Sequence, residues 1–216
     1  MFSVGDLLEL KIEKMVYEGL GLGHNNEGIT IFVDNTCEGD IVEAKIVKVK
    51  KNYIIASLEK IIEPSPYRIQ SFCPIHNACG GCQWQYIEYN KQLEIKQNMV
   101  KEILTKALGR EINIEKTMSS PNIKEFRHKI QMPVSQTKNS KRFLIGYYKK
   151  GSHDIVNIKY CPIQPKIVDE IIEKIRIEAQ NCGVIAYNEK NGKGELRHII
   201  FRVSEYSGDI ILCLVV

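Results

Sequence analysis

The sequence predicts a β-rich α+β fold, in which a small β-barrel precedes an antiparallel sheet packed with two helices. Three observations support this expectation. Short β-forming runs separated by turn residues fill residues 1–62, a proline-rich segment follows, and two helical stripes lie among further β-forming runs in residues 67–216. The composition, 44% apolar and 26% charged, is that of an ordinary globular protein. We therefore expect two domains, 1–62 and 67–216.

The first domain is expected to be a five-stranded barrel of the OB type. Its β-forming runs are residues 4–15, 29–33, 40–50 and 53–58. The glycine-rich stretch 19–23 is expected to connect strands. In the third run the apolar alternation changes phase at Ile46 and Val47, which predicts a bulge. Short strands at this spacing are typical of an OB-like barrel.

The second domain should contain two helices, at residues 89–108 and 165–180. Gly109 and Gly183 stand at the positions where these helices would end. The apolar stripe of the first helix consists of Leu93, Val100, Ile103, Leu104, Ala107 and Leu108. The β-forming runs of this domain are residues 126–134, 142–149, 154–158, 184–187, 196–204 and 209–216. An antiparallel sheet packed with the helices is the simplest arrangement of these elements.

The last β-forming run, 209–216, is strongly apolar and stops without a turn or a polar tail. Such a strand normally pairs onward or is covered, so we expect the sequence to be a fragment of a longer fold. No apolar run approaches the roughly 20 residues that a membrane helix needs. The first residues also lack the pattern of a secretory signal. We therefore expect a cytoplasmic protein with no membrane partner.

Positive charge is concentrated in one segment. Residues 121–161 hold nine basic and two acidic residues, a balance of +7, whereas residues 1–60 hold seven basic and ten acidic residues, a balance of −3. A local excess of this kind suggests a polyanionic partner, nucleic acid first, with a solvated charged face as the alternative. The candidate RNA-binding residues are Arg127, Lys129, Gln131, Arg142, Lys149 and Lys150. Strand alternation places the first three on one face.

Four of the seven cysteines are spaced as ligands of one inorganic centre. Cys73, Cys79 and Cys82 form a C-x5-C-G-G-C motif, and Cys161 is the plausible distant fourth thiol. Thiols this close in a cytoplasmic protein favour a metal over disulfides. Zinc sites usually show two close pairs, so three plus one fits a [4Fe–4S] cluster better; zinc and no metal stay open. His76 is expected to be a solvated loop side chain, with ligation as its alternative.

These motifs resemble the iron–sulfur type of RNA (uracil-C5)-methyltransferase, whose best-known members modify 23S ribosomal RNA. The barrel resembles the TRAM domain that precedes the core in this family. The matching segments are Cys73–Gln85, Phe126–Lys129, Ile145–Tyr148, Tyr160–Ile163 and Gly194–His198. The resemblance covers essentially this whole chain but only about the first half of a family member. It implies transfer of a methyl group from S-adenosylmethionine to C5 of a uridine in RNA.

The resemblance also implies that the catalytic, S-adenosylmethionine-binding domain lies beyond Val216. None of Cys37, Cys182 and Cys213 stands in the Pro-Pro-Arg context of the family's nucleophile, so these three are expected to be small core residues. The glycine-rich stretch 19–23 opens no helix and does not fit a cofactor loop. We therefore expect no catalytic or S-adenosylmethionine-binding residue in this chain. It should be inactive alone, and a separate C-terminal catalytic chain is a candidate partner.

Several alternatives stay open at this point. A transfer RNA enzyme of the same family is one, although the transfer RNA member typically lacks both barrel and cluster, which favours ribosomal RNA. A stand-alone iron–sulfur RNA-binding module is another. A radical S-adenosylmethionine enzyme would carry C-x3-C-x2-C rather than the x5 spacing, and a ferredoxin-like carrier does not need a basic surface. The cluster's role, structural or redox, is also open.

Overall fold

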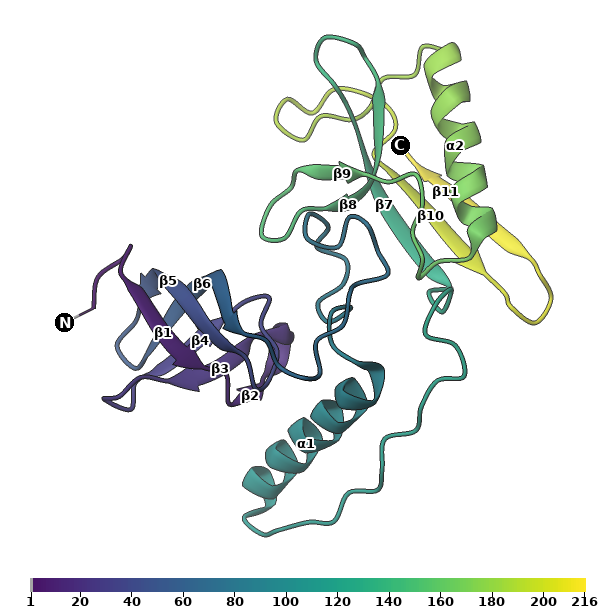
Figure 1. The fold of residues 1–216 in the computed structure, drawn as a ribbon. Helices are drawn as coiled ribbons and strands as arrows, with labels where there is room; N and C mark the ends of the chain where they lie inside the picture. Colours follow the sequence, from purple (N-terminus) through teal and green to yellow (C-terminus); the bar gives the residue numbers. More distant parts are fainter. Residues whose placement is uncertain (1) are drawn as a thin grey trace. The chain divides into compact units, whose positions relative to one another are not determined.

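The computed structural model describes residues 2–216, which fold as two compact units (Figure 1). The barrel unit consists of the chain up to residue 71 together with residues 83–119. The sheet unit consists of residues 72–82 and 120–216. Each unit is thus built from two separate stretches, an interleaving that the expectation of two consecutive domains did not include. None of the helices in residues 2–216 is long and apolar enough to cross a lipid bilayer.

The barrel unit contains one six-stranded sheet, with the strand order β1-β5-β6-β4-β3-β2. Its strands are β1 (Leu7–Lys11), β2 (Lys14–Met15), β3 (Gly21–His24), β4 (Thr30–Val33), β5 (Ile41–Val49) and β6 (Tyr53–Glu63). A short 3-10 helix, Tyr17–Gly19, precedes β3. The expectation of five strands is therefore wrong by one, because part of the glycine-rich stretch forms β3 and the expected run 4–15 divides into β1 and β2. Glycine is needed in β3, since a Cβ on Gly21 would clash with Thr36 Oγ1.

The predicted bulge in β5 is confirmed. Pairing of β5 with β6 shifts register between Ile46 and Lys48. Ile46 is buried, and the next residue, Val47, is 49% exposed. An extra residue at this point bends the strand and increases its twist, which curves the sheet around its buried side chains.

Helix α1 (Tyr89–Leu108) has the predicted bounds and ends at Gly109, whose φ of 65° is left-handed. Its predicted apolar stripe is mostly not a buried face. Ile95 packs into the core of the barrel unit, whereas Val100, Ile103, Leu104 and Leu108 are between 39% and 61% exposed. The reason is that only the first half of the helix contacts the barrel core. Met99, which is partly buried, is the last helix residue that packs against this core.

A buried ion pair anchors the segment after β6. The Asp40 carboxylate is fully buried and accepts hydrogen bonds from the backbone N–H groups of Cys37 (2.6 Å) and Ser65 (2.8 Å). Arg68 donates to the same carboxylate through Nε and Nη2, both at 2.8 Å. Because the pair is desolvated, the carboxylate depends on the guanidinium for neutralisation.

Replacing Arg68 with methionine should lower the free energy of unfolding of the barrel unit by about 3 kcal/mol, because it leaves a buried charge without its counter-ion. Denaturant unfolding measures this effect. Lys14→Met is the control, since Lys14 pairs with Glu102 at 2.7 Å on the surface and should cost less than about 1 kcal/mol. Equal losses of unfolding free energy in the two variants would show that the buried Asp40–Arg68 pair contributes no more to stability than a surface pair.

The sheet unit contains a five-stranded antiparallel sheet with the order β11-β10-β7-β8-β9. Its elements are β7 (Lys129–Gln136), β8 (Phe143–Tyr148), β9 (Ile155–Asn157), α2 (Lys166–Asn181), β10 (His198–Val203) and β11 (Ile210–Val215). This agrees with the predicted antiparallel sheet. The predicted run 184–187 is not a strand, since only an isolated bridge joins Ala186 to Leu196. Strand β11 lies at the edge of the sheet.

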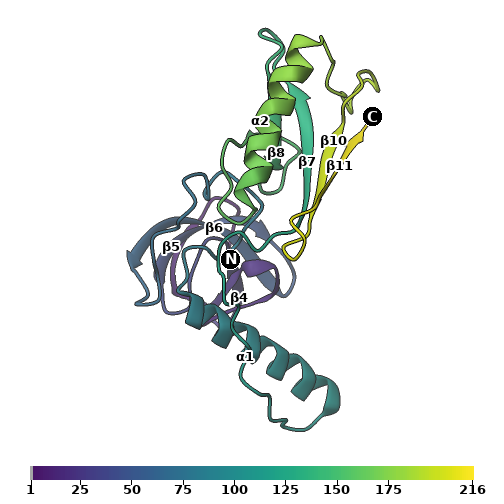
Figure 2. The same cartoon turned by 90° about the vertical axis from the view of Figure 1, so that its right-hand side faces the viewer.

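Helix α2 covers one face of this sheet (Figure 2). Val168 and Ile172 of the helix pack with the buried residues Ile130, Ile199 and Phe201 of β7 and β10. Because strand side chains alternate, the residues between these buried positions point to the opposite face. The sheet therefore has an apolar face, which α2 covers, and an opposite face that carries Lys129 and Gln131.

Candidate functional site

All four predicted ligand cysteines lie in the sheet unit. Cys73, Cys79 and Cys82 belong to the segment 72–82, and Cys161 stands shortly before α2. Cys79 and Cys82 pack against a small cluster that contains Cys161. The apolar residues of this cluster and its surroundings are Phe72, Ile75, Tyr147, Ile158 and Ile163. The fold therefore brings thiols from two distant parts of the sequence into one region.

The electrostatics of these thiols also reflect their proximity. Burial raises the pKa of Cys161 to about 11, and the charges of Cys82 and Cys73 add to the increase. Burial likewise raises the pKa of Cys79, which also senses Cys73. Within residues 2–216, no three histidine, cysteine or carboxylate side chains stand in the geometry of a formed metal site. The thiols thus share one environment, and a metal would have to displace their protons on binding.

Gly80 allows the loop of the motif to pass close to its neighbours. The Gly81 N–H donates to Cys79 Sγ at 3.4 Å. Gly80 donates its N–H to the carbonyl oxygen of Tyr148 at 2.9 Å, and a Cβ on Gly80 would lie 2.9 Å from that same oxygen. A side chain at Gly80 would push the loop away from β8, whereas a Cβ on Gly81 would make only ordinary van der Waals contacts.

The neighbouring histidine differs from its expected state. His76 is only 8% exposed, so the expectation of a solvated side chain is wrong. The loop folds back on itself, with the His76 N–H donating to the Cys73 carbonyl at 3.3 Å. Burial lowers the pKa of His76, and the charge of Lys150 lowers it further. The imidazole is therefore more readily neutral than that of an exposed histidine.

A hydrogen-bond network fixes the backbone at Cys161. The Cys161 N–H donates to Asp169 Oδ2 at 3.2 Å, and Gln164 Nε2 donates to Asp169 Oδ1 at 2.6 Å. Tyr147 donates its hydroxyl to Gln164 Oε1 at 3.2 Å. Gln164 is 1% exposed. Asp169, in the first turn of α2, therefore holds both the cysteine and a buried amide.

Asp169→Ala should weaken the hold on Cys161, because it removes both acceptor oxygens. We expect the proposed metal content to fall and the rate of metal loss to a chelator to rise roughly tenfold or more, the usual scale for outer-shell partners of ligands. Glu170→Ala is the matched control, since Glu170 is the next residue of the same helix and is exposed. Equal metal retention in both variants would contradict a positioning role for Asp169.

Arg127 lies beside the thiols. Its guanidinium carbon is 5.4 Å from the centroid of the Tyr147 ring. Burial lowers the pKa of Arg127, but Tyr147 and the charges of Cys82 and Cys161 outweigh this and raise it. The prediction that Arg127 shares a strand face with Lys129 is wrong, because β7 begins at Lys129 and the Arg127 N–H instead bonds to the Ile163 carbonyl at 2.8 Å.

The other candidate RNA-binding residues occupy different settings. Lys129 and Gln131 are exposed on β7. Lys149 is 3.8 Å from Asp154, which neutralises part of its charge. Arg142 and Lys150 are exposed at the two ends of β8, outside the strand itself. The structure thus places Lys129 and Gln131 together and sets the remaining four apart from them.

The isolated cysteines were expected to be core residues, and this holds only for Cys37, which is fully buried. Cys182 and Cys213 are exposed. Cys182 caps the C-terminus of α2, and Cys213 lies on the edge strand β11. An apolar sequence context alone did not distinguish an edge strand from a buried one.

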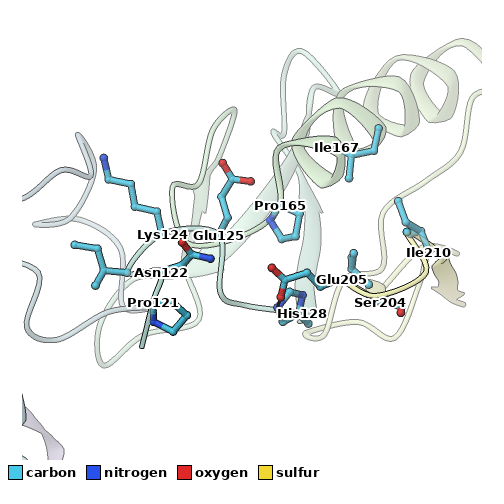
Figure 3. Close-up of a pocket in the computed structure, with 13 residues that line it drawn as sticks. Pro121, Asn122, Lys124, Glu125, His128, Pro165, Ile167, Ser204, Glu205 and Ile210 are labelled. Carbon is cyan, nitrogen blue, oxygen red and sulfur yellow. Dashed lines mark ion pairs between the residues drawn. The ribbon is translucent and has the colours of Figure 1, made fainter. Parts of the chain in front are cut away.

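Sequence reasoning did not identify a pocket of about 700 Å³ beside the start of α2 (Figure 3). His128 and Glu205 lie next to each other in it, with Nε2 of the imidazole 3.5 Å from the carboxylate. Pro165, Ile167 and Ile210 contribute apolar lining. The lining comes from three separated segments, so no local motif marks it. Its volume is in the range of small-molecule sites.

Comparison with known proteins gives a consistent result. Residues 2–58 match the TRAM domain family. An uncharacterized RNA methyltransferase of Synechocystis sp. is 36% identical over 216 residues, which are 100% of this chain and 46% of that protein. An uncharacterized RNA methyltransferase of Clostridium tetani is 37% identical over 206 residues, 95% of this chain and 44% of that protein.

The fold also resembles a solved enzyme. The crystal structure of Pyrococcus abyssi tRNA (uracil-54, C5)-methyltransferase in complex with S-adenosyl-L-homocysteine superposes with a TM-score of 0.67 at 25% sequence identity. The match covers 95% of this chain and 45% of that one. The chain spans about half the length of the relatives that it matches. It therefore contains a TRAM domain and is related, along almost its whole length, to proteins described as RNA methyltransferases.

Proposed function

We propose that this chain is the RNA-binding and [4Fe–4S]-binding portion of an S-adenosylmethionine-dependent RNA (uracil-C5)-methyltransferase. The observation that carries the proposal is the gathering of Cys79, Cys82 and Cys161 in one small cluster, with Cys73 close enough to influence two of them. The similarity to RNA methyltransferases supports the RNA and methyl-transfer parts of the proposal.

The residues present fit an iron–sulfur cluster in their chemistry. Four cysteine thiolates are the usual donor set of a [4Fe–4S] cluster. Apolar side chains surround Cys161, and Arg127 places a positive charge beside the thiols. Backbone N–H groups such as that of Gly81 already point to a ligand sulfur. The positive charge of Arg127 and the backbone N–H groups both favour an anionic sulfur centre.

We propose that the cluster's role is structural. Bound, it would supply a covalent tie between the segment 72–82 and Cys161. The 78 residues between Cys82 and Cys161 include most of the segment with a balance of +7. Holding its two ends together would restrict the conformations open to that segment. Residues in it could then meet RNA with less loss of conformational entropy on binding.

Ribosomal RNA is the proposed substrate class, and transfer RNA is the second candidate. The four-cysteine motif favours the first through the resemblance it carries, whereas the barrel does not discriminate, because the match to a tRNA enzyme covers 95% of this chain. The similarity to an enzyme described as a tRNA (uracil-54, C5)-methyltransferase favours the second. Binding measurements with unmodified 23S ribosomal RNA fragments and unmodified transfer RNA would discriminate the two, and we expect the ribosomal fragment to bind more tightly.

Methyl transfer itself is proposed to need residues outside this chain, because none of its residues fits the nucleophile or the cofactor loop of the family. The test is an assay with labelled S-adenosylmethionine and unmodified RNA, with and without a separately produced catalytic half. We expect RNA binding by the 216-residue chain but methylation only when the catalytic half is present. Methylation by the chain alone would overturn this division of roles.

A further inference from the structure

The face of the five-stranded sheet opposite α2 has a distinct composition. We call it the open face and define it by the strand register of β7, β10 and β11. Its residues are Lys129, Gln131, Pro133, His198, Ile200, Arg202, Ile211, Cys213 and Val215. None of these positions holds an acidic residue. The face therefore carries positive charge with no negative charge in its own rows.

Two cations stand directly opposite each other on the open face. Lys129 of β7 and Arg202 of β10 are register partners, and both are exposed. Directly opposite side chains lie about 5 Å apart at Cβ, and like charges there destabilise a sheet. Some cations of the unit are paired with a carboxylate, for example Arg197 with Glu189 at 3.4 Å. No such partner occurs for Lys129 or Arg202 among residues 2–216. A repulsion without local compensation is relieved when an anion binds.

The neighbouring positions add groups that recognise bases. Gln131 follows Lys129 on the same face and is exposed, with an amide that can both donate and accept hydrogen bonds. His198 lies at the other end of β10, and burial lowers its pKa, with Arg197 adding to the shift. A neutral imidazole is a stacking surface of the kind that single-stranded RNA sites use. Ile211, 67% exposed, borders the cations with apolar surface.

We propose that the open face binds single-stranded RNA, with Lys129 and Arg202 contacting the phosphate backbone and Gln131 contacting a base edge. The inference rests on the proposed function, because it names the surface by which this chain holds RNA. Single-stranded RNA fits better than a duplex, since the face combines paired cations with apolar and amide groups that contact unstacked bases. Arg202 lies outside the basic segment 121–161 and enters the surface through strand pairing alone.

The test is equilibrium binding of a single-stranded oligouridine of about 12 nucleotides, a length within the usual site size, measured between 50 and 300 mM salt. Each phosphate contact in a single strand contributes about 0.7 to the slope of log affinity against log salt. Arg202→Gln and Lys129→Gln should each reduce the slope by about 0.7 and the affinity by roughly fivefold near 0.1 M salt. The double variant should combine both losses.

Lys174→Gln is the matched control, because Lys174 is exposed on α2, which covers the other face. It should leave the salt slope unchanged. Thermal unfolding of each variant verifies that the fold is retained. As a second readout, 4-thiouridine in the oligonucleotide should crosslink to peptides of β7 and β10.

The outcomes separate the two proposals. Wild-type binding that is weakened equally by Lys174→Gln and Arg202→Gln would overturn the open-face assignment and leave RNA binding by this chain intact. Failure of the folded wild-type chain to bind any RNA would overturn the proposed function as well. If Arg202→Gln left RNA affinity unchanged but altered the association state of the chain, the face would be a protein interface and the assignment to RNA would be wrong.

Discussion

Cys161→Ala is expected to prevent stable assembly of the proposed iron–sulfur cluster. Iron per chain should fall well below the value of about four for the unchanged chain, because three thiolates leave one iron of the proposed cluster without a protein ligand. The same loss is expected for Cys82→Ala, although Cys82 and Cys161 are separated by 78 residues of sequence. Anaerobic purification followed by iron and acid-labile sulfide analysis measures the effect.

Cys182→Ala is the control for this experiment. Cys182 is an exposed cysteine at the end of α2, and its replacement should leave iron and sulfide unchanged. Equal iron in Cys161→Ala and Cys182→Ala would show that Cys161 is not a ligand. The proposed association of the C-x5-C-G-G-C motif with Cys161 would then be wrong.

Loss of the cluster is expected to destabilise the sheet unit by about 4 kcal/mol. A tie between residues 82 and 161 closes a long loop, and the chain-entropy model for crosslinks gives about this value for a loop of that size. The barrel unit has its own core and does not contain the four cysteines. Its stability should therefore change by less than about 1 kcal/mol.

Hydrogen exchange followed by peptide mass spectrometry measures both units in one sample. After oxidative removal of the cluster, amides of β7 and β10 should exchange about a thousandfold faster, whereas amides of β5 and β6 should keep their protection. Unchanged protection in β7 and β10 would show that the cluster is not a structural tie. Equal loss in both units would show that the units do not unfold independently.

The sequence predicted best those elements whose limits are set by local chemistry. Helix α1 begins at Tyr89 and ends at Leu108 as expected, because Gly109 takes the left-handed conformation that ends a helix. The bulge at Ile46 in β5 was also predictable, since a change of apolar phase requires it. The spacing of Cys73, Cys79 and Cys82 alone suggested them as ligands, and that role stays a prediction.

The features that the sequence did not predict depend on pairing between distant segments. The partnership of Lys129 with Arg202 follows from the register of β7 with β10, which no local periodicity contains. The exposure of Ile103 and Leu104 in α1 depends on how far the barrel core extends along the helix. Arg127 leaves the strand because its backbone bonds to Ile163 near Cys161. Which strands pair, and in which register, depends on the tertiary fold, and local residue patterns constrain it only weakly.

The most direct test of the account is Mössbauer spectroscopy of the chain produced with iron-57 and purified without oxygen, together with iron, sulfide and zinc analysis. We predict about four irons and four sulfides per chain and the spectrum of a [4Fe–4S] centre with cysteine ligands. One zinc per chain without sulfide would contradict the account, and so would a folded chain that retains no metal after reconstitution with iron and sulfide.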